Sequence, residues 1–284
     1  MTDADVGTTG SEGAPDLTQD AVTAALGDRP ARAFVALVSS EAEAMRWART
    51  EAPDGAVVVA QHQIGLRDRV GIPWPVAPDS GLAFSVVLHP HLPPIRAGRL
   101  YLAGIAALLE ALPGDIAVEW PDRVLDAGGE FLGGVVTRVS SGVRGIDWCV
   151  VTFYFVSTSR SRAELMAEVV RAFDDHWGSD DVALQGFYKE RCRTIGRRLR
   201  ATFMPLGPRS RQVEGEAVDV TAGGALVVVA AEDRKVPLQV NDIGKLQYLT
   251  ESGELESPGP VSPLLEAWPM GGDVAPPSGP GWTP

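Results

Sequence analysis

The hydrophobic pattern of this 284-residue chain changes its period after Gly196, and this change constrains the fold more than any other feature. Before Gly196, apolar stripes with helical spacing alternate with short apolar runs that fit strands. After it the period is two, and turn signals separate the runs. The expected strands are Leu199 to Phe203, Val213 to Val220, Ala225 to Ala230, Val236 to Val240 and Ile243 to Leu249. Short strands in such close succession predict a small β-barrel.

The chain before Gly196 reads as one larger unit with mixed secondary structure. Ser40 with Glu43 fits a capping box for a helix that ends near Thr50, and Ser161 caps a later helix. Further helices are expected over residues 17–26, 102–112 and 184–196, and strands over 34–38, 57–60, 82–88, 116–120, 132–139 and 148–156. We therefore predict an α+β fold, a mixed β-sheet flanked by helices over residues 17–195, with a separate small domain over 196–250.

Composition excludes several classes of function. The formal net charge is -12, which argues against a broad electrostatic surface for nucleic acid or for an anionic membrane. Cys149 and Cys192 are too few for a disulfide framework, and we interpret Cys149 as a core thiol. His89 and His91 lack a third ligand, and we interpret them as part of a turn and not as a metal-binding pair.

The ends of the chain differ from its middle. Residues 1–16 are small, polar and acidic, and residues 251–284 are rich in proline and glycine, so we predict that both are disordered. The first residues lack the basic and apolar regions of a signal peptide, and the sequence has no apolar run of about 18 residues. We therefore expect a cytoplasmic protein without a membrane partner.

An irregular loop between two predicted apolar strands concentrates the polar chemistry of the chain. Arg67 and Arg69 lie between Gly65 and Gly71, ahead of Trp74. Cations, flexible backbone and an aromatic wall together suit a phosphate-bearing ligand. The alternative is a solvated surface loop, because two arginines and two glycines form a weak motif.

Four segments, in their order along the chain, resemble the motifs of biotin protein ligases, in the superfamily that these share with lipoate ligases. The segments are Ser39-Ser40-Glu41, the stretch from Gln61 to Trp74, Glu119-Trp120-Pro121-Asp122-Arg123 and Phe131-Leu132-Gly133-Gly134. At these places the family carries S-T-N, E-x-Q-x-x-G-R-G-R-x-G-R-x-W, K-W-P-N-D and K-L-A-G-I-L. The resemblance covers roughly residues 17–250. It implies a core like that of class II aminoacyl-tRNA synthetases, followed by an SH3-like β-barrel.

The resemblance also implies ligands and the residues that bind them. Biotin and ATP with Mg²⁺ are the implied ligands, and a biotin carboxyl carrier domain is the implied protein partner. The implied ligand-binding residues are Ser39, Ser40, Glu41, Gln63, Arg67, Asp68, Arg69, Trp74, Gly133 and Gly134. The nucleotide and metal candidates are Trp120, Asp122 and Arg123. If the site holds an anion, Arg67 and Arg69 should project into one cavity with Ser39, Gln63 and Gly134.

Several family positions hold a different residue in this chain. Glu119 and Phe131 stand where the family has lysines, and Asp68 replaces a glycine between the two loop arginines. Loss of a preorganised cation weakens the stabilisation of developing phosphate charge. We therefore assign no catalytic residue and expect adenylation to be weak or lost. Glu119 is either an edge-strand carboxylate or a group that neutralises the loop arginines from within.

Three functions remain open from the sequence. The first is a biotin ligase that acts on the carrier domain of acetyl-CoA carboxylase. The second is a non-catalytic module that binds a biotin-like or acyl ligand, or a carrier domain. The third is ATP-independent lipoyl or octanoyl transfer, which needs a lysine or cysteine nucleophile that neither Phe131 nor Cys149 supplies. The sequence gives no oligomeric state.

Overall fold

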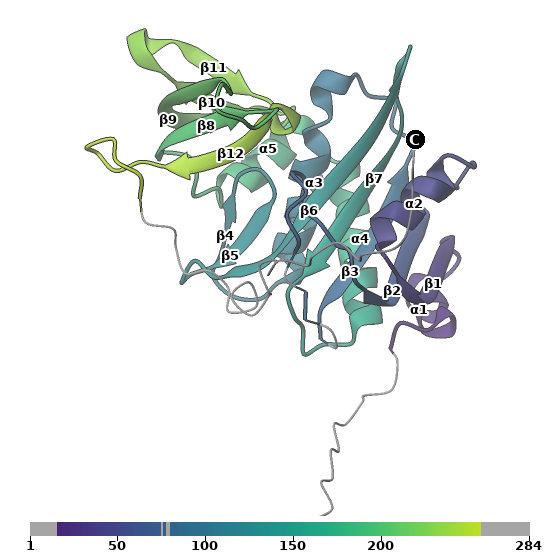
Figure 1. Cartoon of the computed structure of the whole chain (residues 1–284). Helices are drawn as coiled ribbons and strands as arrows, with labels where there is room; N and C mark the ends of the chain where they lie inside the picture. The colour runs from purple at the N-terminus through teal and green to yellow at the C-terminus, as the bar shows by residue number, and fades with distance from the viewer. Residues whose placement is uncertain (1–15, 75, 78–79, 257–284) are drawn as a thin grey trace, which may run out of the picture.

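The computed structural model describes residues 16–74, 76–77 and 80–256, which form two β-sheets (Figure 1). The first sheet has seven strands in the order β1-β2-β3-β7-β6-β5-β4. Its strands are β1 Ala31–Leu37, β2 Val57–Gln63, β3 Leu82–Leu88, β4 Ile116–Glu119, β5 Arg123–Asp126, β6 Phe131–Gly142 and β7 Gly145–Phe155. β1 and β2 are parallel, and the other neighbours in this sheet are antiparallel.

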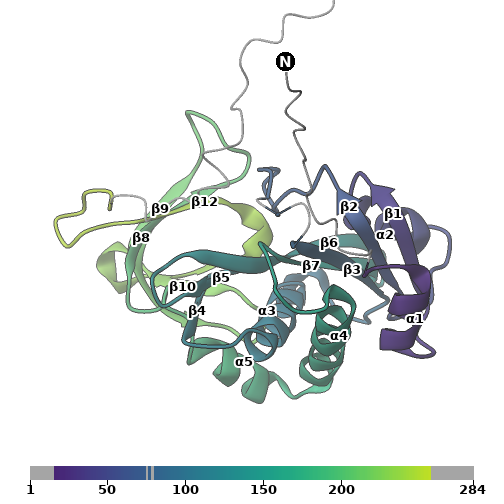
Figure 2. The same cartoon turned by 90° about the horizontal axis from the view of Figure 1, so that it is seen from below.

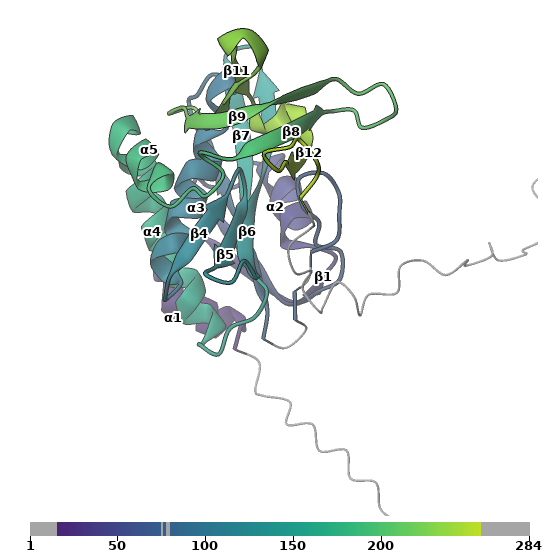
Figure 3. The same cartoon turned by 90° about the vertical axis from the view of Figure 1, so that its left-hand side faces the viewer.

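Helices cover both faces of the seven-stranded sheet. The helix α2 packs on β2, β3 and β7, while α3 packs on β6 and against α4 on the opposite face (Figures 2 and 3). The helices are α1 Gln19–Leu26, α2 Ser40–Ala48, α3 Arg99–Ala111, α4 Arg162–Gly178 and α5 Asp181–Lys189, with 3-10 turns at Pro94–Arg96, Ala231–Asp233 and Val240–Asp242. Since α3 lies between the sheet, α4 and α5, nearly all of its residues are buried, and its apolar surface extends around the helix.

Two of the predicted helix caps can be compared with the structure. Ser161 caps α4 as predicted, and its side chain accepts a hydrogen bond from the Glu164 N–H. For α2 the prediction is wrong by one residue, because the cap is Ser39, whose Oγ accepts from the Ala42 N–H at 3.1 Å. Ser40 is the first residue of the helix, and its side chain is free for another contact.

The strands after Gly196 form the second sheet. They are β8 Arg198–Phe203, β9 Gln212–Val220, β10 Leu226–Val229, β11 Lys235–Leu238 and β12 Ile243–Tyr248, in the antiparallel order β11-β10-β9-β8-β12. This confirms the predicted fold class, a helix-flanked mixed sheet followed by a small β unit. The division into domains at residue 196 stays a prediction, because one apolar cluster runs through the interiors of both sheets.

The five-stranded sheet docks closely on the beginning of α3. A Cβ atom at Gly98 would lie 2.3 Å from the carbonyl oxygen of Gly223, so the two main chains touch without side chains between them. Gly224 has a φ of +85°, a conformation that favours glycine. The indole Nε1 of Trp120 donates a hydrogen bond to the Gly224 carbonyl at 3.0 Å. Main-chain contact and one buried aromatic residue therefore both contribute to the position of the second sheet.

Parts of the predicted disordered ends are held in place. The Arg162 Nε donates to the Asp16 carboxylate at 2.8 Å, and Leu249 pairs with Leu255 in an isolated β-bridge. The prediction of disorder is therefore wrong for Asp16 and for residues 251–256. Its remainder, residues 1–15 and 257–284, lies outside the described residues. Among the described residues, no helix has the length and apolar character to cross a membrane.

Candidate functional site

The loop between β2 and β3 folds back on itself as a narrow turn. Arg67 and Pro73 form an isolated antiparallel bridge at its base. The Asp68 Oδ1 accepts hydrogen bonds from the N–H groups of Val70 at 2.9 Å and Ile72 at 2.7 Å. An aspartate side chain that bonds the main chain two residues onward stabilises a turn. The Asp68 carboxylate therefore shapes the loop.

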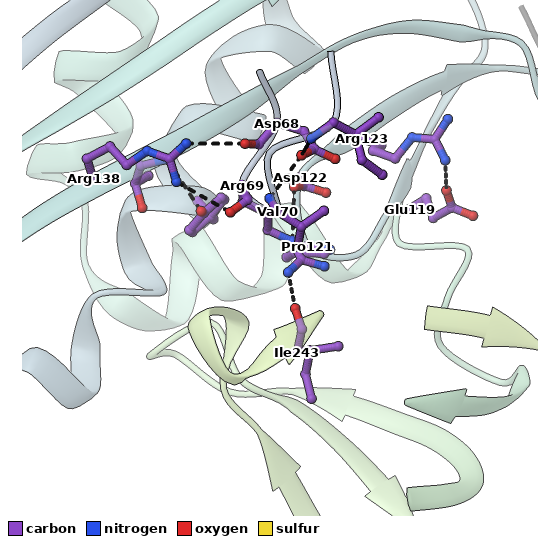
Figure 4. Close-up of polar contacts among 12 residues, drawn as sticks. Asp68, Arg69, Val70, Glu119, Pro121, Asp122, Arg123, Arg138 and Ile243 are labelled. Atoms are coloured by element: carbon purple, nitrogen blue, oxygen red, sulfur yellow. Dashed lines mark hydrogen bonds and ion pairs between the residues drawn. The ribbon is translucent and has the colours of Figure 1, made fainter. Parts of the chain in front are cut away.

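The two loop arginines bind different partners. The exposed Arg67 donates from Nη1 to the Gly71 carbonyl of its own loop at 2.8 Å. Arg69 points the other way: its Nε lies 3.2 Å from the Asp122 Oδ2, and its Nη1 donates to the Ile243 carbonyl in β12 (Figure 4). The structure does not bring the two guanidinium groups into one cavity, so that expectation is wrong.

The carboxylate that neutralises the loop is Asp122, and not Glu119. Burial raises the pKa of Asp122 to about 6, even though Arg69 and Arg123 oppose the shift. Glu119 instead accepts a hydrogen bond from the Arg123 Nη1 at 2.8 Å and lies 3.9 Å from an Arg193 nitrogen. An ion pair as deeply buried as Arg69–Asp122 depends on both partners, because either charge alone would be uncompensated.

Arg138 on β6 braces the loop from the sheet. Its guanidinium donates to the carbonyls of Asp68 at 3.2 Å and Arg69 at 3.4 Å (Figure 4). Its Nε donates to the Glu41 carboxylate at 3.1 Å. One side chain thus connects the loop, the sheet and the beginning of α2. Sequence reasoning missed this residue; its signal was a charge inside a mostly apolar predicted strand.

Aromatic side chains fill the space beneath the loop. The fully buried Tyr154 ring contacts Trp74, and its centroid lies 5.5 Å from that of Phe131. A Cβ atom at Gly134 would lie 2.3 Å from the Asp122 carbonyl oxygen and 3.2 Å from the Tyr154 ring. Gly134 is therefore required for close packing, and the tyrosine ring occupies the volume next to it.

The polar residues predicted to contact a ligand already have partners within the protein. The Ser40 N–H donates to the Gln63 Oε1 at 2.6 Å, and the Gln63 Nε2 donates to the Ala83 carbonyl at 2.7 Å. The Ser40 Oγ lies 2.9 Å from the Ser85 Oγ, which in turn lies 2.9 Å from the Thr152 Oγ1. A ligand here would compete with this buried network.

The remaining predicted residues have structural contacts. The Trp120 N–H donates to the Thr194 Oγ1 at 2.9 Å, and its indole faces the second sheet. A Cβ atom at Gly133 would lie 2.4 Å from the Tyr154 carbonyl oxygen. The Arg123 guanidinium lies 4.8 Å from the centroid of the Phe131 ring. Over the described ranges, no group of three or more His, Cys, Asp and Glu residues is placed to hold a metal ion.

Comparisons with known proteins point to one family. No family model matches the chain. A biotin--[acetyl-CoA-carboxylase] ligase of Mycobacterium tuberculosis (strain ATCC 25618 / H37Rv) is 26% identical over 217 residues, which cover 63% of this chain and 78% of that protein. The apo biotin protein ligase of Aquifex aeolicus has a TM-score of 0.58 at 15% identity, covering 78% of this chain and 99% of the other.

Two further solved structures are similar in the same way. The Aquifex aeolicus ligase in complex with biotin and ATP has a TM-score of 0.57 at 17% identity, with 77% of this chain and 99% of the other covered. A biotin protein ligase-like protein of unknown function from Silicibacter sp. TM1040 has a TM-score of 0.54 at 15% identity, with 75% and 95% covered. The chain therefore has the α+β fold of the biotin protein ligases. In sequence it is also similar to a biotin--[acetyl-CoA-carboxylase] ligase, which supports a relation to the biotin protein ligase and lipoate ligase family.

Proposed function

We propose that this protein, most like biotin-[acetyl-CoA-carboxylase] ligases in fold and sequence, has lost biotin adenylation and acts as a binding module for a biotin-like or acyl ligand or for a carrier domain. The observation that carries the proposal is that Arg69 is paired with groups of the same chain. Its guanidinium is bound to Asp122 and to the Ile243 carbonyl, both within the chain. A guanidinium that is already paired with a carboxylate stabilises charge that develops on a reacting phosphate less than an unpaired one does.

The other cations near the site support the same conclusion. The positions of the two family lysines hold Glu119 and Phe131, and the nearby Arg123 is bonded to Glu119 and lies over the Phe131 ring. Removal of one preorganised charge costs roughly a hundredfold or more in rate. Several such losses together predict adenylate formation slower than in an intact ligase by several powers of ten.

The residues present do not fit ATP with Mg²⁺. Asp122 is paired with Arg69 and so is not free to act as a metal ligand. The Tyr154 ring lies against Gly134, and Phe131 supplies an apolar face in place of a cation. A biotin-like ligand fits better, because Ser40 and Gln63 offer donors and acceptors for a ureido group once the Tyr154 ring moves.

The test combines a binding measurement with a kinetic one. Biotin is titrated calorimetrically into the protein with and without ATP, and biotin-dependent pyrophosphate exchange is measured in parallel. We expect no exchange above background, and no effect of ATP on biotin binding. The double substitution Glu119→Lys with Phe131→Lys should raise exchange, whereas the matched pair Glu119→Gln with Phe131→Leu should not. Robust biotin transfer to a carrier domain by the unaltered protein would refute the proposal.

A second candidate is a ligase that remains active. The sequence relative that is a biotin--[acetyl-CoA-carboxylase] ligase favours it, and Arg123 is then the cation that replaces a lysine. This candidate predicts that Arg123→Met abolishes pyrophosphate exchange. Nothing favours acyl transfer by a cysteine, because burial raises the pKa of both Cys149 and Cys192 and keeps their thiols protonated.

A further inference from the structure

A small cavity lies where the loop, α3, β6 and the five-stranded sheet meet. Its volume is about 70 Å³, and its polar lining is formed by Arg69, Tyr101, Thr137, Arg138 and Asn241. The pairing of β5 with β6 reaches Gly134, and Thr137 and Arg138, which line the cavity, lie on β6 beyond that pairing. The residues predicted to bind a biotin-like ligand at Ser39, Gln63 and Gly134 do not line it.

One wall of the cavity carries an unsatisfied polar group. Thr137 is 4% exposed, and its Oγ1 has no hydrogen-bond partner among the described residues. A buried hydroxyl without a partner costs about 1–3 kcal/mol. The Thr137 N–H donates to the Tyr101 hydroxyl oxygen at 3.3 Å. Burial raises the pKa of Tyr101, so this hydroxyl keeps its own proton for donation.

The lining favours a ligand that only accepts hydrogen bonds. Two hydroxyl groups supply donors, together with those guanidinium N–H groups of Arg69 and Arg138 that are not already bonded to Asp122, to Glu41 or to main-chain carbonyls. Oxyanions match such a set of donors, and charge-assisted hydrogen bonds are the stronger ones. The volume exceeds the roughly 10–15 Å³ that a cavity needs in order to hold one water molecule. At the rim, Met204 is 47% exposed and Asn241 is exposed, which leaves a path from solvent.

We propose that this cavity binds a small oxyanion, a phosphate or carboxylate group, and that the bound anion ties the β2–β3 loop to the five-stranded sheet. Arg69 is central to this role because it lines the cavity and also bonds the Ile243 carbonyl in β12. The site goes beyond the proposed function, and its occupancy does not require biotin.

The experiment measures thermal unfolding and calorimetric binding of the full chain with inorganic phosphate or with acetate, against sodium chloride of equal ionic strength. We expect a saturable rise in the unfolding temperature with at least one of the two anions. Thr137→Val and Tyr101→Phe should each weaken that affinity by tenfold or more. In chloride alone, Thr137→Val should be at least as stable as the unaltered protein, because it removes an unsatisfied hydroxyl. Thr158→Val, a threonine substitution outside the cavity lining, should leave the affinity unchanged.

A comparison of the two anions identifies whether the cavity binds a phosphate or a carboxylate group. Binding of phosphate alone supports a phosphate group, and binding of acetate alone supports a carboxylate. The proposal is overturned if neither anion gives a saturable effect, or if Thr137→Val and Tyr101→Phe respond to the anions as the unaltered protein does, since that pattern is a general salt effect. Titration with biotin reports separately on the proposed function, so the two proposals fail independently.

Discussion

The Nε atom of Arg69 lies 3.2 Å from the Oδ2 atom of Asp122, and this pair joins the loop after β2 to the segment after β4. Since Arg69 also bonds the Ile243 carbonyl, one side chain connects three separate parts of the chain. The loop is thereby closed by contacts within the protein. A ligand that took the place of Asp122 at Arg69 would remove a buried partner, which costs several kcal/mol.

The titration of Asp122 gives a first prediction. Its pKa is raised from 3.8 to about 6, so the folded state binds a proton more readily than the unfolded state does. The stability that protonated Asp122 contributes is present below pH 4 and is lost as the pH rises through about 6. Asn does not titrate, so the unfolding free energy of the unaltered protein, relative to Asp122→Asn, should fall by up to about 3 kcal/mol between pH 4 and pH 7. Urea unfolding at a series of pH values measures the free energy of unfolding of both proteins. Parallel pH profiles for the two proteins would contradict the prediction.

A second prediction concerns the hydroxyl of Tyr154. It is buried and has no hydrogen-bond partner among the described residues. Tyr154→Phe keeps the ring that packs on Trp74 and Phe131, so the unfolding free energy should stay unchanged or rise by about 1 kcal/mol. Tyr154→Ala should instead cost about 3–5 kcal/mol because it leaves a cavity. A clear loss of stability in Tyr154→Phe would reveal a partner for the hydroxyl.

Limited proteolysis tests the role of Arg138. Its bonds to the carbonyls of Asp68 and Arg69 hold the loop against the sheet, so Arg138→Met should expose the loop. Trypsin should then cleave after Arg67 or Arg69 several times faster than in the unaltered protein. Arg144→Met, at an exposed position in the turn between β6 and β7, is the control and should leave the cleavage rate unchanged. Equal rates in all three proteins would show that other contacts hold the loop.

The docking of the second sheet depends on Trp120. Trp120→Phe keeps an aromatic ring but leaves the Gly224 carbonyl without the indole donor. We expect a loss of about 1–3 kcal/mol in the free energy of unfolding. Hydrogen exchange should show the loss most clearly at amides of β9 and β10, which flank the turn that contains Gly224. Uniform exchange across both sheets would argue against a local role.

The fold was predictable because its main signals are local. The change of period after Gly196 predicted the second sheet, and the apolar run from Leu82 to Leu88 matches β3 in full. The strand β5 was missed because its four residues, Arg123–Asp126, are too short to show a period. Ser40 was misassigned as a cap because Ser39 and Ser40 carry the same hydroxyl, and only the main chain decides between them.

The site was less predictable, since side-chain partners are set by tertiary contacts. Glu119 was one candidate to neutralise the loop, but Glu119 ends β4 and Asp122 lies in the turn that follows, and sequence spacing does not say which one faces Arg69. The role of Arg138 in holding the loop could not be predicted, because its partners are the carbonyls of a loop that lies 69 or more residues earlier in the chain. The roles of the predicted ligand-binding residues stay predictions.

The bond from Trp120 to Gly224 changes what a motif match can mean. Within the segment that aligns with K-W-P-N-D, the tryptophan helps to hold the second sheet in place. The charged positions are the ones that the resemblance links to the nucleotide and the metal. The tryptophan contributes to the stability of the fold whether or not the charged positions are kept. A sequence can therefore keep a recognisable part of a family's motif for structural reasons even when the reaction of that family has been lost.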